Sequence, residues 1–265
     1  MFCDLHVHSD CSDGEFSPAT VIDTLAAAGV SLVALTDHDT TAGLAEAQAR
    51  ARERNVRFIG GIEMTTYGMG AVLHVLGLGI AAGNADLEFA NRRANRIFGE
   101  NQERWIRSLA ADGLDVSWER DFPESPVRLP VLIERLCRAG HSGGNPRLCH
   151  AAFRDFFAAL PLEAYEALPT PAQAGSIIRA AGGVAILAHP AELAQDGRAV
   201  NLLESLDGLE ALYARYDRSV CDSLRELALR HGKLYSCGSD WHGYFQGPYK
   251  NPDFEAPPEL LTRLV

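Results

Sequence analysis

The chain has 265 residues, 47% of them hydrophobic, and its formal net charge is −11. The length suits one large domain or a domain with an insertion, and the negative charge disfavours a broad nucleic-acid surface held by phosphate contacts. No run of about 18 apolar residues occurs, so we expect no membrane span. We see no secretory signal, and the six cysteines lack C-x-x-C spacing, so we expect a cytoplasmic protein with free thiols.

Short apolar runs alternate with helical segments along the chain. Strands are predicted at 2–7, 32–36, 57–62, 72–78, 184–188, 208–213 and 234–237. Helices are predicted after Ser17-Pro18, from Thr41 to Arg54, after Thr170-Pro171 and from Ser219 to His231. This alternation indicates an α/β fold, with about seven strand–helix units in a parallel barrel or sheet.

Residues 83–168 break this rhythm. Their pattern is mostly helical, with a Pro-rich stretch at 121–126 and a Gly-rich turn at 142–146. We therefore predict a helical insertion subdomain, 83–168, that caps the active site of a barrel formed by residues 1–82 and 169–265.

Polar motifs follow the predicted strands. His6 and His8 lie two residues apart on the first strand, so their side chains share one face. In a parallel barrel the carboxyl ends of all strands open on one face, where residues distant in sequence converge. The residues expected to converge there are His6, His8, Asp13, His38, Glu63, His74, His189, Asp240 and His242.

These nitrogen and oxygen ligands exceed the roughly four to six that one metal ion takes, so we predict two or three divalent ions. The set contains no cysteine, which favours zinc, manganese or iron in a catalytic site with open positions. A single His or Asp at a strand end is often only structural, and His74 in mid-strand fits either role. The other histidines, His141, His150 and His231, are expected at the surface.

The motifs together resemble the polymerase and histidinol phosphatase (PHP) family of metal-dependent phosphoesterases. They are Asp4-Leu5-His6-Val7-His8, Thr36-Asp37-His38-Asp39, Gly61-Ile62-Glu63, Ala188-His189-Pro190 and Gly238-Ser239-Asp240-Trp241-His242. The resemblance spans residues 2–243 and implies a distorted (β/α)7 barrel, similar to a TIM barrel, with a mostly helical insertion.

The resemblance also implies three metal pockets. The first is formed by His6, His8, Glu63 and Asp240, the second by Asp13, His38 and His242, and the third by Glu63, His74 and His189. A metal-activated hydroxide would attack phosphorus in line. The proton for the leaving group could come from a metal-bound water, His242 or Asp37.

Asp13 stands where many relatives have histidine, which is typical of a subgroup that resembles nucleotide phosphatases and 5′-to-3′ RNA-trimming exonucleases. The phosphate-contacting groups of that subgroup are altered. Pro130 replaces a histidine, the acidic Glu192 stands near an expected basic residue, and a late lysine of the insertion is missing. Arg128 remains a candidate substrate contact, whereas Arg147 and Arg154 are expected to be solvated. Trp241 and Tyr244 could stack on a base or pack against the barrel rim.

The leading prediction is hydrolysis of a phosphomonoester of a small, nucleotide-like metabolite. One alternative is a 5′-to-3′ exonuclease on RNA or single-stranded DNA ends, which the acidic charge disfavours. Another is an amidohydrolase, although many of these use a carbamylated lysine in mid-chain and the only lysines here are Lys233 and Lys250. A non-catalytic metal-binding module is the third, and the complete ligand set opposes it.

Overall fold

The computed structural model describes residues 2–124, 126–195, 197–243 and 246–264. Tyr244, and Ser125 of the Pro-rich stretch, lie outside these ranges. One seven-stranded sheet has the order β1-β2-β3-β4-β5-β6-β7. Its strands are β1 (Cys3–Val7), β2 (Leu32–Leu35), β3 (Arg57–Gly68), β4 (Ala71–Leu78), β5 (Val184–Leu187), β6 (Gly208–Tyr213) and β7 (Leu234–Gly238). All seven predicted strands are confirmed.

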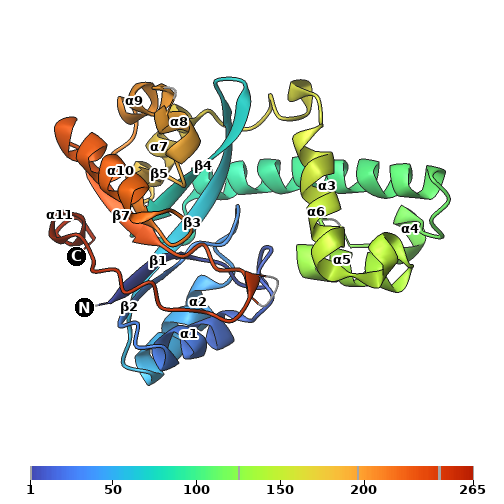
Figure 1. Ribbon diagram of the computed structural model, residues 1–265, viewed down its shortest axis with the longest axis horizontal. Helices are drawn as coiled ribbons and strands as arrows, with labels where there is room; N and C mark the ends of the chain where they lie inside the picture. Colours follow the sequence, from blue (N-terminus) through green and yellow to red (C-terminus); the bar gives the residue numbers. More distant parts are fainter. Residues whose placement is uncertain (1, 125, 196, 244–245, 265) are drawn as a thin grey trace.

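The sheet curls into a nearly closed barrel (Figure 1). Its two edges meet where the segment after β7 lies beside β1, with Val7 and Trp241 in a parallel bridge. The backbone N–H of His8 donates to the carbonyl of Trp241 at 3.0 Å, and that of Asp240 to the carbonyl of His6 at 2.7 Å. The (β/α)7 barrel predicted from the motifs is therefore confirmed.

The expectation of a wholly parallel barrel is wrong at β4, which runs antiparallel to both β3 and β5. The physical reason is the connection between β3 and β4, which consists only of Met69 and Gly70. Both residues have positive φ, 56° and 75°, as a two-residue hairpin turn requires. So short a link can join only antiparallel strands, and it extends β3 well beyond the predicted 57–62.

Helices cover the outside of the barrel: α1 (Pro18–Ala27), α2 (Leu44–Glu53), α7 (Pro171–Ala180), α8 (Ala191–Gln195), α9 (Arg198–Leu203), α10 (Arg218–Arg230) and α11 (Pro258–Leu261). The four predicted helices are among them. The Ser17 side chain caps α1, and Thr170 and Gln173 form a capping box on α7. None of the helices in the described ranges is long and apolar enough to cross a membrane.

The two faces of β2 show how the core is divided. Val33 and Leu35 belong to a buried cluster that includes Ile22 of α1 and Ala47 of α2. Leu32 and Ala34 belong to a second cluster built from strand residues such as Leu5, Leu76 and Ile186. One face of the sheet is therefore covered by helices, and the other fills the barrel interior with strand side chains.

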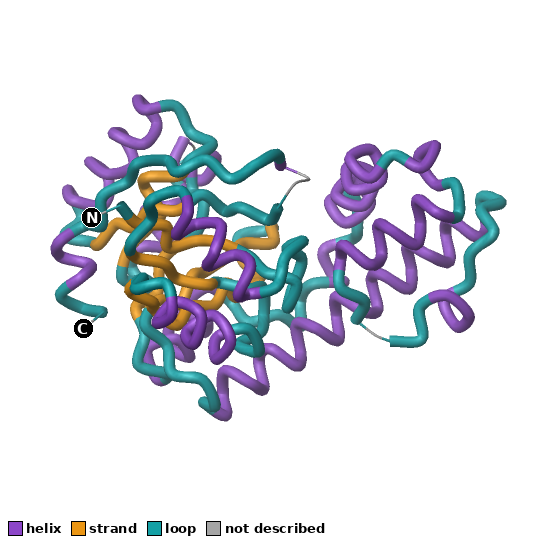
Figure 2. Tube along the Cα trace, turned by 90° about the horizontal axis from the view of Figure 1, so that it is seen from below, coloured by secondary structure: helices purple, strands orange, loops and turns teal. Residues whose placement is uncertain are grey.

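Between β4 and β5 the chain leaves the barrel as helices: α3 (Ala85–Ala111), α4 (Trp118–Asp121), α5 (Leu129–Arg138), α6 (Pro146–Ala158) and two short 3₁₀ turns. Figures 1 and 2 show α3 running outward from the barrel, with α5 and α6 packed on its far part. These helices share a buried cluster of their own that includes Trp105, Phe122, Leu132 and Phe153. The insertion therefore has its own apolar core beside the barrel.

Candidate metal centre

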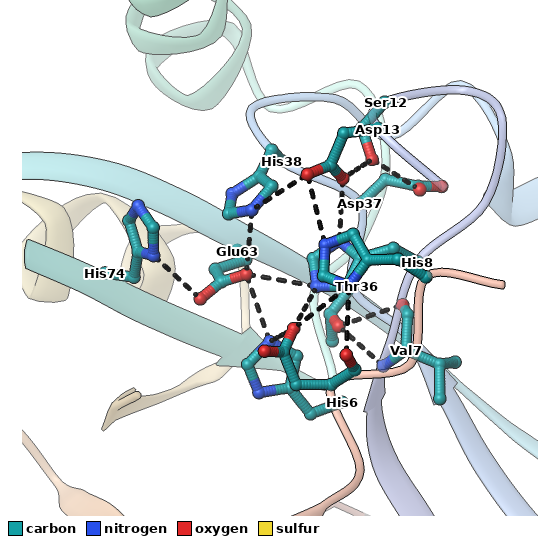
Figure 3. Close-up of polar contacts among 12 residues, drawn as sticks. His6, Val7, His8, Ser12, Asp13, Thr36, Asp37, His38, Glu63 and His74 are labelled. Atoms are coloured by element: carbon teal, nitrogen blue, oxygen red, sulfur yellow. Dashed lines mark hydrogen bonds and ion pairs between the residues drawn. The ribbon is translucent and has the colours of Figure 1, made fainter. Parts of the chain in front are cut away.

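The Glu63 carboxylate lies at the centre of the polar site (Figure 3). Its side chain is 1% exposed and is ringed by imidazole nitrogens at 3.0–3.3 Å. Oε2 faces His6, His8 and His38, whereas Oε1 faces His74 and His189. One carboxylate thus joins two halves of a histidine cluster, as a bridging metal ligand does.

The backbone brings these side chains together by continuing the sheet past the ends of its strands. The segment after β2 runs beside β3, so that Glu63 N–H donates to the carbonyl of Asp37 and Asp39 N–H donates to that of Glu63. This places His38 over Glu63. Because β4 runs antiparallel, its His74 lies opposite Thr65 of β3, two residues beyond Glu63.

Three groups of side chains have their ligand atoms within 4.8 Å of one another. They are His6, His8, Glu63 and Asp240; His8, Asp13, His38 and His242; and His38, Glu63 and His74. The first has the membership of the first predicted pocket, and the second adds His8. The third contains His38 instead of His189, whose Nε2 is 3.3 Å from His74 Nδ1. Metal binding by these nine residues stays a prediction.

The chemistry of the group fits divalent cations. Nδ1 of His38 is buried without a hydrogen-bond partner in the described part of the chain. The ring nitrogens of His8 are buried without a well-aligned hydrogen bond there, although Nε2 lies 3.1 Å from Asp240 Oδ1 and 3.2 Å from Glu63 Oε2. Buried polar atoms of native proteins are almost always satisfied, so these nitrogens point to a missing partner. The donors are all imidazole nitrogens and carboxylate oxygens, a set that suits manganese, zinc or iron.

Mutual electrostatics keep this cluster charged in the absence of metal. Burial by itself raises the pKa of the Glu63 carboxyl, but the imidazoles of His6, His38 and His74 outweigh it and hold that pKa well below its usual range. Burial lowers the pKa of His8, but its contacts with Asp240 and Glu63 outweigh this and raise that pKa to about 10. The metal-free site therefore holds protons that a cation must displace.

Glu210, on β6, contacts two of the candidate ligands, His6 and His189, and was not predicted from the sequence. Its carboxylate is fully buried; Oε1 lies 3.0 Å from His6 Nδ1 and Oε2 accepts a hydrogen bond from His189 N–H at 2.9 Å. A carboxylate on the second ring nitrogen fixes the orientation of a metal-binding histidine. The available signal was an acidic residue in an otherwise apolar strand, Gly208–Tyr213.

Asp240 is oriented by two further side chains that the sequence did not indicate. The Tyr213 hydroxyl donates to Asp240 Oδ2 at 2.7 Å, and Arg215 Nη2 donates to the Asp240 carbonyl at 2.7 Å. Asp240 and His189 both have positive φ, 53° and 30°. Such conformations are costly for residues with a side chain and cluster at functional sites.

The two residues considered as general acids lie in different surroundings. The buried carboxylate of Asp37 accepts hydrogen bonds from Ser9 N–H, Ser9 Oγ and Ser12 Oγ at 2.6–2.8 Å, so it orders the loop that carries Asp13. His242 lies among the candidate ligands, with Nε2 3.1 Å from Asp13 Oδ2. The geometry gives Asp37 a positioning role and leaves its catalytic role untested.

The PHP domain family matches residues 4–106. The chain is 31% identical to a phosphoribosyl 1,2-cyclic phosphate 1,2-diphosphodiesterase of Eggerthella lenta, over 97% of this chain and all of that protein. It is also 31% identical to a 3′,5′-nucleoside bisphosphate phosphatase of Chromobacterium violaceum, over 92% of this chain and 88% of the relative. This chain belongs to the PHP family of phosphoesterases.

Two further similar proteins match most of the length of this chain. A 5′-3′ exoribonuclease of Haemophilus influenzae is 29% identical over 90% of this chain and 89% of its own length. A solved structure from Bifidobacterium adolescentis, assigned as a metal-dependent phosphoesterase, superposes with a TM-score of 0.82 at 24% identity. It covers 99% of this chain and 96% of that one, so the barrel and the insertion belong to one shared fold.

The candidate metal centre of this PHP protein opens into a cleft of about 790 Å³ between the barrel and the insertion. Barrel residues such as Asp13, His38 and His242 line one side, and residues of α3, α5 and α6 line the other. Arg128 lines the cleft and crosses it, with Nη1 2.9 Å from Asp10 Oδ2 and hydrogen-bonded to the Asp10 carbonyl. Its predicted substrate contact remains a prediction.

Trp241 and Arg147 lie away from the cleft. The Trp241 ring is 5% exposed, lies 5.6 Å from the Phe16 ring and 5.4 Å from that of Tyr249, and its Nε1 donates to the Gly247 carbonyl. Packing is therefore the correct alternative for Trp241. Arg147 is exposed on α6, as expected.

Replacing Glu63 with Gln should remove at least one metal ion. Gln keeps the size of the side chain but has one ligand oxygen and no charge, so it cannot bridge two groups of histidines. We expect Mn²⁺-loaded Glu63→Gln to show lower metal content by mass spectrometry and to lose most of its activity. Glu192→Gln, at an exposed position, serves as the control. Full metal content in Glu63→Gln would overturn the bridging assignment.

Replacing Glu210 with Gln should weaken metal binding without unfolding the barrel. The variant leaves one acceptor oxygen for two N–H donors, so either His6 or the His189 backbone loses its partner. Loss of such support typically costs roughly 10- to 100-fold in metal affinity. Titration calorimetry with Mn²⁺ measures the change, circular dichroism checks the fold, and exposed Glu226→Gln is the matched control. Equal affinities would remove Glu210 from the site.

Metal affinity should depend on pH because of His8. Its pKa of about 10 means that the ring is protonated at neutral pH in the metal-free chain, and binding releases that proton. Between the ordinary pKa of 6.5 and pH of about 9, apparent Mn²⁺ affinity should rise roughly tenfold per pH unit for each proton released. Calorimetry in buffers of different ionisation enthalpy counts the protons. An affinity that does not change with pH would contradict a protonated His8.

Proposed function

We propose that this PHP protein removes phosphate from small, nucleotide-like phosphomonoesters. The observation that carries the proposal is a candidate metal-ligand cluster at one side of a cleft whose other side includes an apolar wall. Divalent ions bound to the cluster would supply an activated water and offset the charge of the phosphoryl oxygens. The cleft volume, about 790 Å³, is in the range of sites for small molecules.

The apolar side of the cleft suits a flat, uncharged group. Phe98, Phe153 and Phe157 line it, with ring centroids 4.2–6.0 Å apart, and Leu160 and Leu168 extend it. Aromatic walls of this kind bind rings through contact area and stacking. With the phosphate at the histidine cluster, a nucleobase or similar ring would lie against these phenylalanines.

We assign two kinds of role to the side chains of the site: donation of a proton and positioning of the candidate ligands. We infer that His242, rather than Asp37, hands a proton to the leaving oxygen when its Nε2 does not hold a metal ion, because His242 lines the cleft and the Asp37 oxygens are engaged by Ser9 and Ser12. Glu210 and Asp37 keep the histidines and the Asp13 loop in position. General acid catalysis of this kind contributes typically 10²- to 10⁴-fold.

We further propose that residues 83–168 act as a cap over the barrel formed by residues 1–82 and 169–265. The Arg128–Asp10 ion pair is a direct contact between the insertion and the loop that carries Asp13. A cap that excludes water strengthens every charge interaction inside the site. Localisation in the cytoplasm also stays a prediction from the sequence.

A second candidate is exonucleolytic cleavage, favoured by the similarity to 5′-3′ exoribonucleases over 90% of the chain. Three exposed arginines of α3, Arg92, Arg96 and Arg107, are paired with glutamates, which leaves less positive charge for a nucleic-acid backbone. An amidohydrolase site bridged by a carbamylated lysine is opposed by the lysines: neither lines the cleft, and Lys233 donates to the Leu206 carbonyl.

Substrate profiling of the Mn²⁺-loaded chain tests the proposal. We expect inorganic phosphate from nucleoside monophosphates or bisphosphates, and no shortening of 5′-phosphorylated RNA oligomers. Released phosphate and chromatographic separation of nucleotides measure the two reactions, with Glu63→Gln as the inactive control. Stepwise release of mononucleotides from RNA would favour the exonuclease. Complete metal binding without turnover of any phosphate ester would favour a non-catalytic module.

A further inference from the structure

One polar side chain, Asn101 of α3, lies within the apolar wall of the cleft. It lines the cleft although its side chain is only 2% exposed. Its Nδ2 is buried and has no hydrogen-bond partner among the described residues. Buried polar atoms of native proteins almost always have a partner, because an unpaired one costs free energy. An unpaired amide in the wall of a cleft is therefore suited to a ligand that enters the cleft.

Helix geometry places this amide among aromatic rings. Phe98, Asn101 and Trp105 are three and four residues apart on α3, so they share one face of the helix. The rings on both sides of Asn101 contact the same ring of α6: the Phe153 centroid lies 6.0 Å from that of Phe98 and 5.4 Å from that of Trp105. Asn101 therefore lies on the α3 face that packs against Phe153, within the wall that Phe98, Phe153 and Phe157 form.

Two neighbouring amides of α3 show what is unusual about Asn101. The adjacent Gln102 is fully buried and satisfied at both ends, because its Nε2 donates to the Val127 carbonyl at 2.6 Å and its Oε1 accepts from Val127 N–H at 2.9 Å. Asn95 also lines the cleft, and its Nδ2 donates to the Asp39 carbonyl at 2.8 Å. The fold uses the N–H groups of both amides, whereas those of Asn101 stay available.

Two polar residues of α6 also line the cleft, but both are more exposed than Asn101. They are His150, contrary to its expected surface position, and Arg154, which is exposed as expected. A hydrogen bond is stronger where water is excluded, and an unmade one costs more there. Asn101 is therefore better placed than either residue of α6 to discriminate between ligands through a hydrogen bond.

We propose that Asn101 recognises the edge of the nucleobase and makes the site selective for adenine. The inference rests on the proposed function and narrows it to adenine nucleotides. An amide carries a donor and an acceptor side by side, which match the N7 acceptor and the N6 amino donor of adenine. Guanine and hypoxanthine present the acceptors O6 and N7 instead, so one end of the amide would face a group of its own kind. The phenylalanines contact the faces of the ring, and the amide contacts its edge.

Steady-state kinetics of the unaltered, Mn²⁺-loaded chain test the selectivity. The substrates are adenosine 5′-monophosphate, its 7-deaza analogue, which lacks the N7 acceptor, and inosine 5′-monophosphate, which lacks the N6 donor. We expect kcat/KM for the adenosine nucleotide to exceed that for each of the other two by roughly tenfold or more, mainly through KM. Equal values for the three nucleotides would overturn the proposal while leaving a phosphatase.

Asn101→Leu assigns the selectivity to this side chain, because leucine is similar in size and has no hydrogen-bonding group. We expect the preference for the adenosine nucleotide to disappear, so that the ratios of kcat/KM values fall to about one. Asn91→Leu is the matched control: Asn91 also lies on α3 with a buried, unpaired amide oxygen, but it does not line the cleft. The control should keep the preference, and an unchanged preference in Asn101→Leu would overturn the proposal.

Binding of adenosine and 7-deazaadenosine, measured by calorimetry, provides a readout that needs neither turnover nor a variant. Tighter binding of adenosine by the unaltered chain, lost in Asn101→Leu, supports the proposal. Equal binding of the two nucleosides by the unaltered chain would contradict it. Absence of hydrolysis of all three nucleotides by the metal-loaded chain would instead contradict the proposed function, and the comparison of nucleosides would still decide the role of Asn101.

Discussion

A buried negative charge, the Glu63 carboxylate, is the constraint on which the rest of this structure depends. An unpaired carboxylate in a barrel interior would cost several kilocalories per mole, so the fold must bring it compensating groups. It does so with imidazoles from four other parts of the chain, all within 3.3 Å. The same arrangement leaves His38 Nδ1 buried without a hydrogen-bond partner among the described residues, and His8 without a well-aligned hydrogen bond.

The hairpin of β3 and β4 brings His74 beside Glu63. A long β3 carries Glu63 in its middle, and the turn at Met69 and Gly70 returns β4 antiparallel beside it. His74 thereby faces Glu63 Oε1, at 3.2 Å, from within a strand rather than from a loop after it. The departure from a parallel barrel is therefore part of the site.

The insertion adds a second wall to the candidate metal centre on the barrel face, so that the two form a cleft. Phenylalanines of α3 and α6 supply an apolar wall. A ring bound on that wall would help to fix the scissile phosphate over the histidines. Holding a substrate at several points is how binding energy from remote groups assists reaction.

The sequence by itself determined the seven strands and the residue types of the candidate metal ligands, because alternation, turn residues and side-chain chemistry are local properties of the chain. Only the tertiary structure decided which other residues contact the candidate metal ligands or line the cleft beside them. Glu210 in an apolar strand, Asp37 turned toward Ser9, and Arg154 facing the cleft owe their roles to partners far away in sequence. The direction of β4 was set by the two-residue turn at Met69 and Gly70. The apolar pattern did not reveal it, since that pattern is the same whichever way a strand runs.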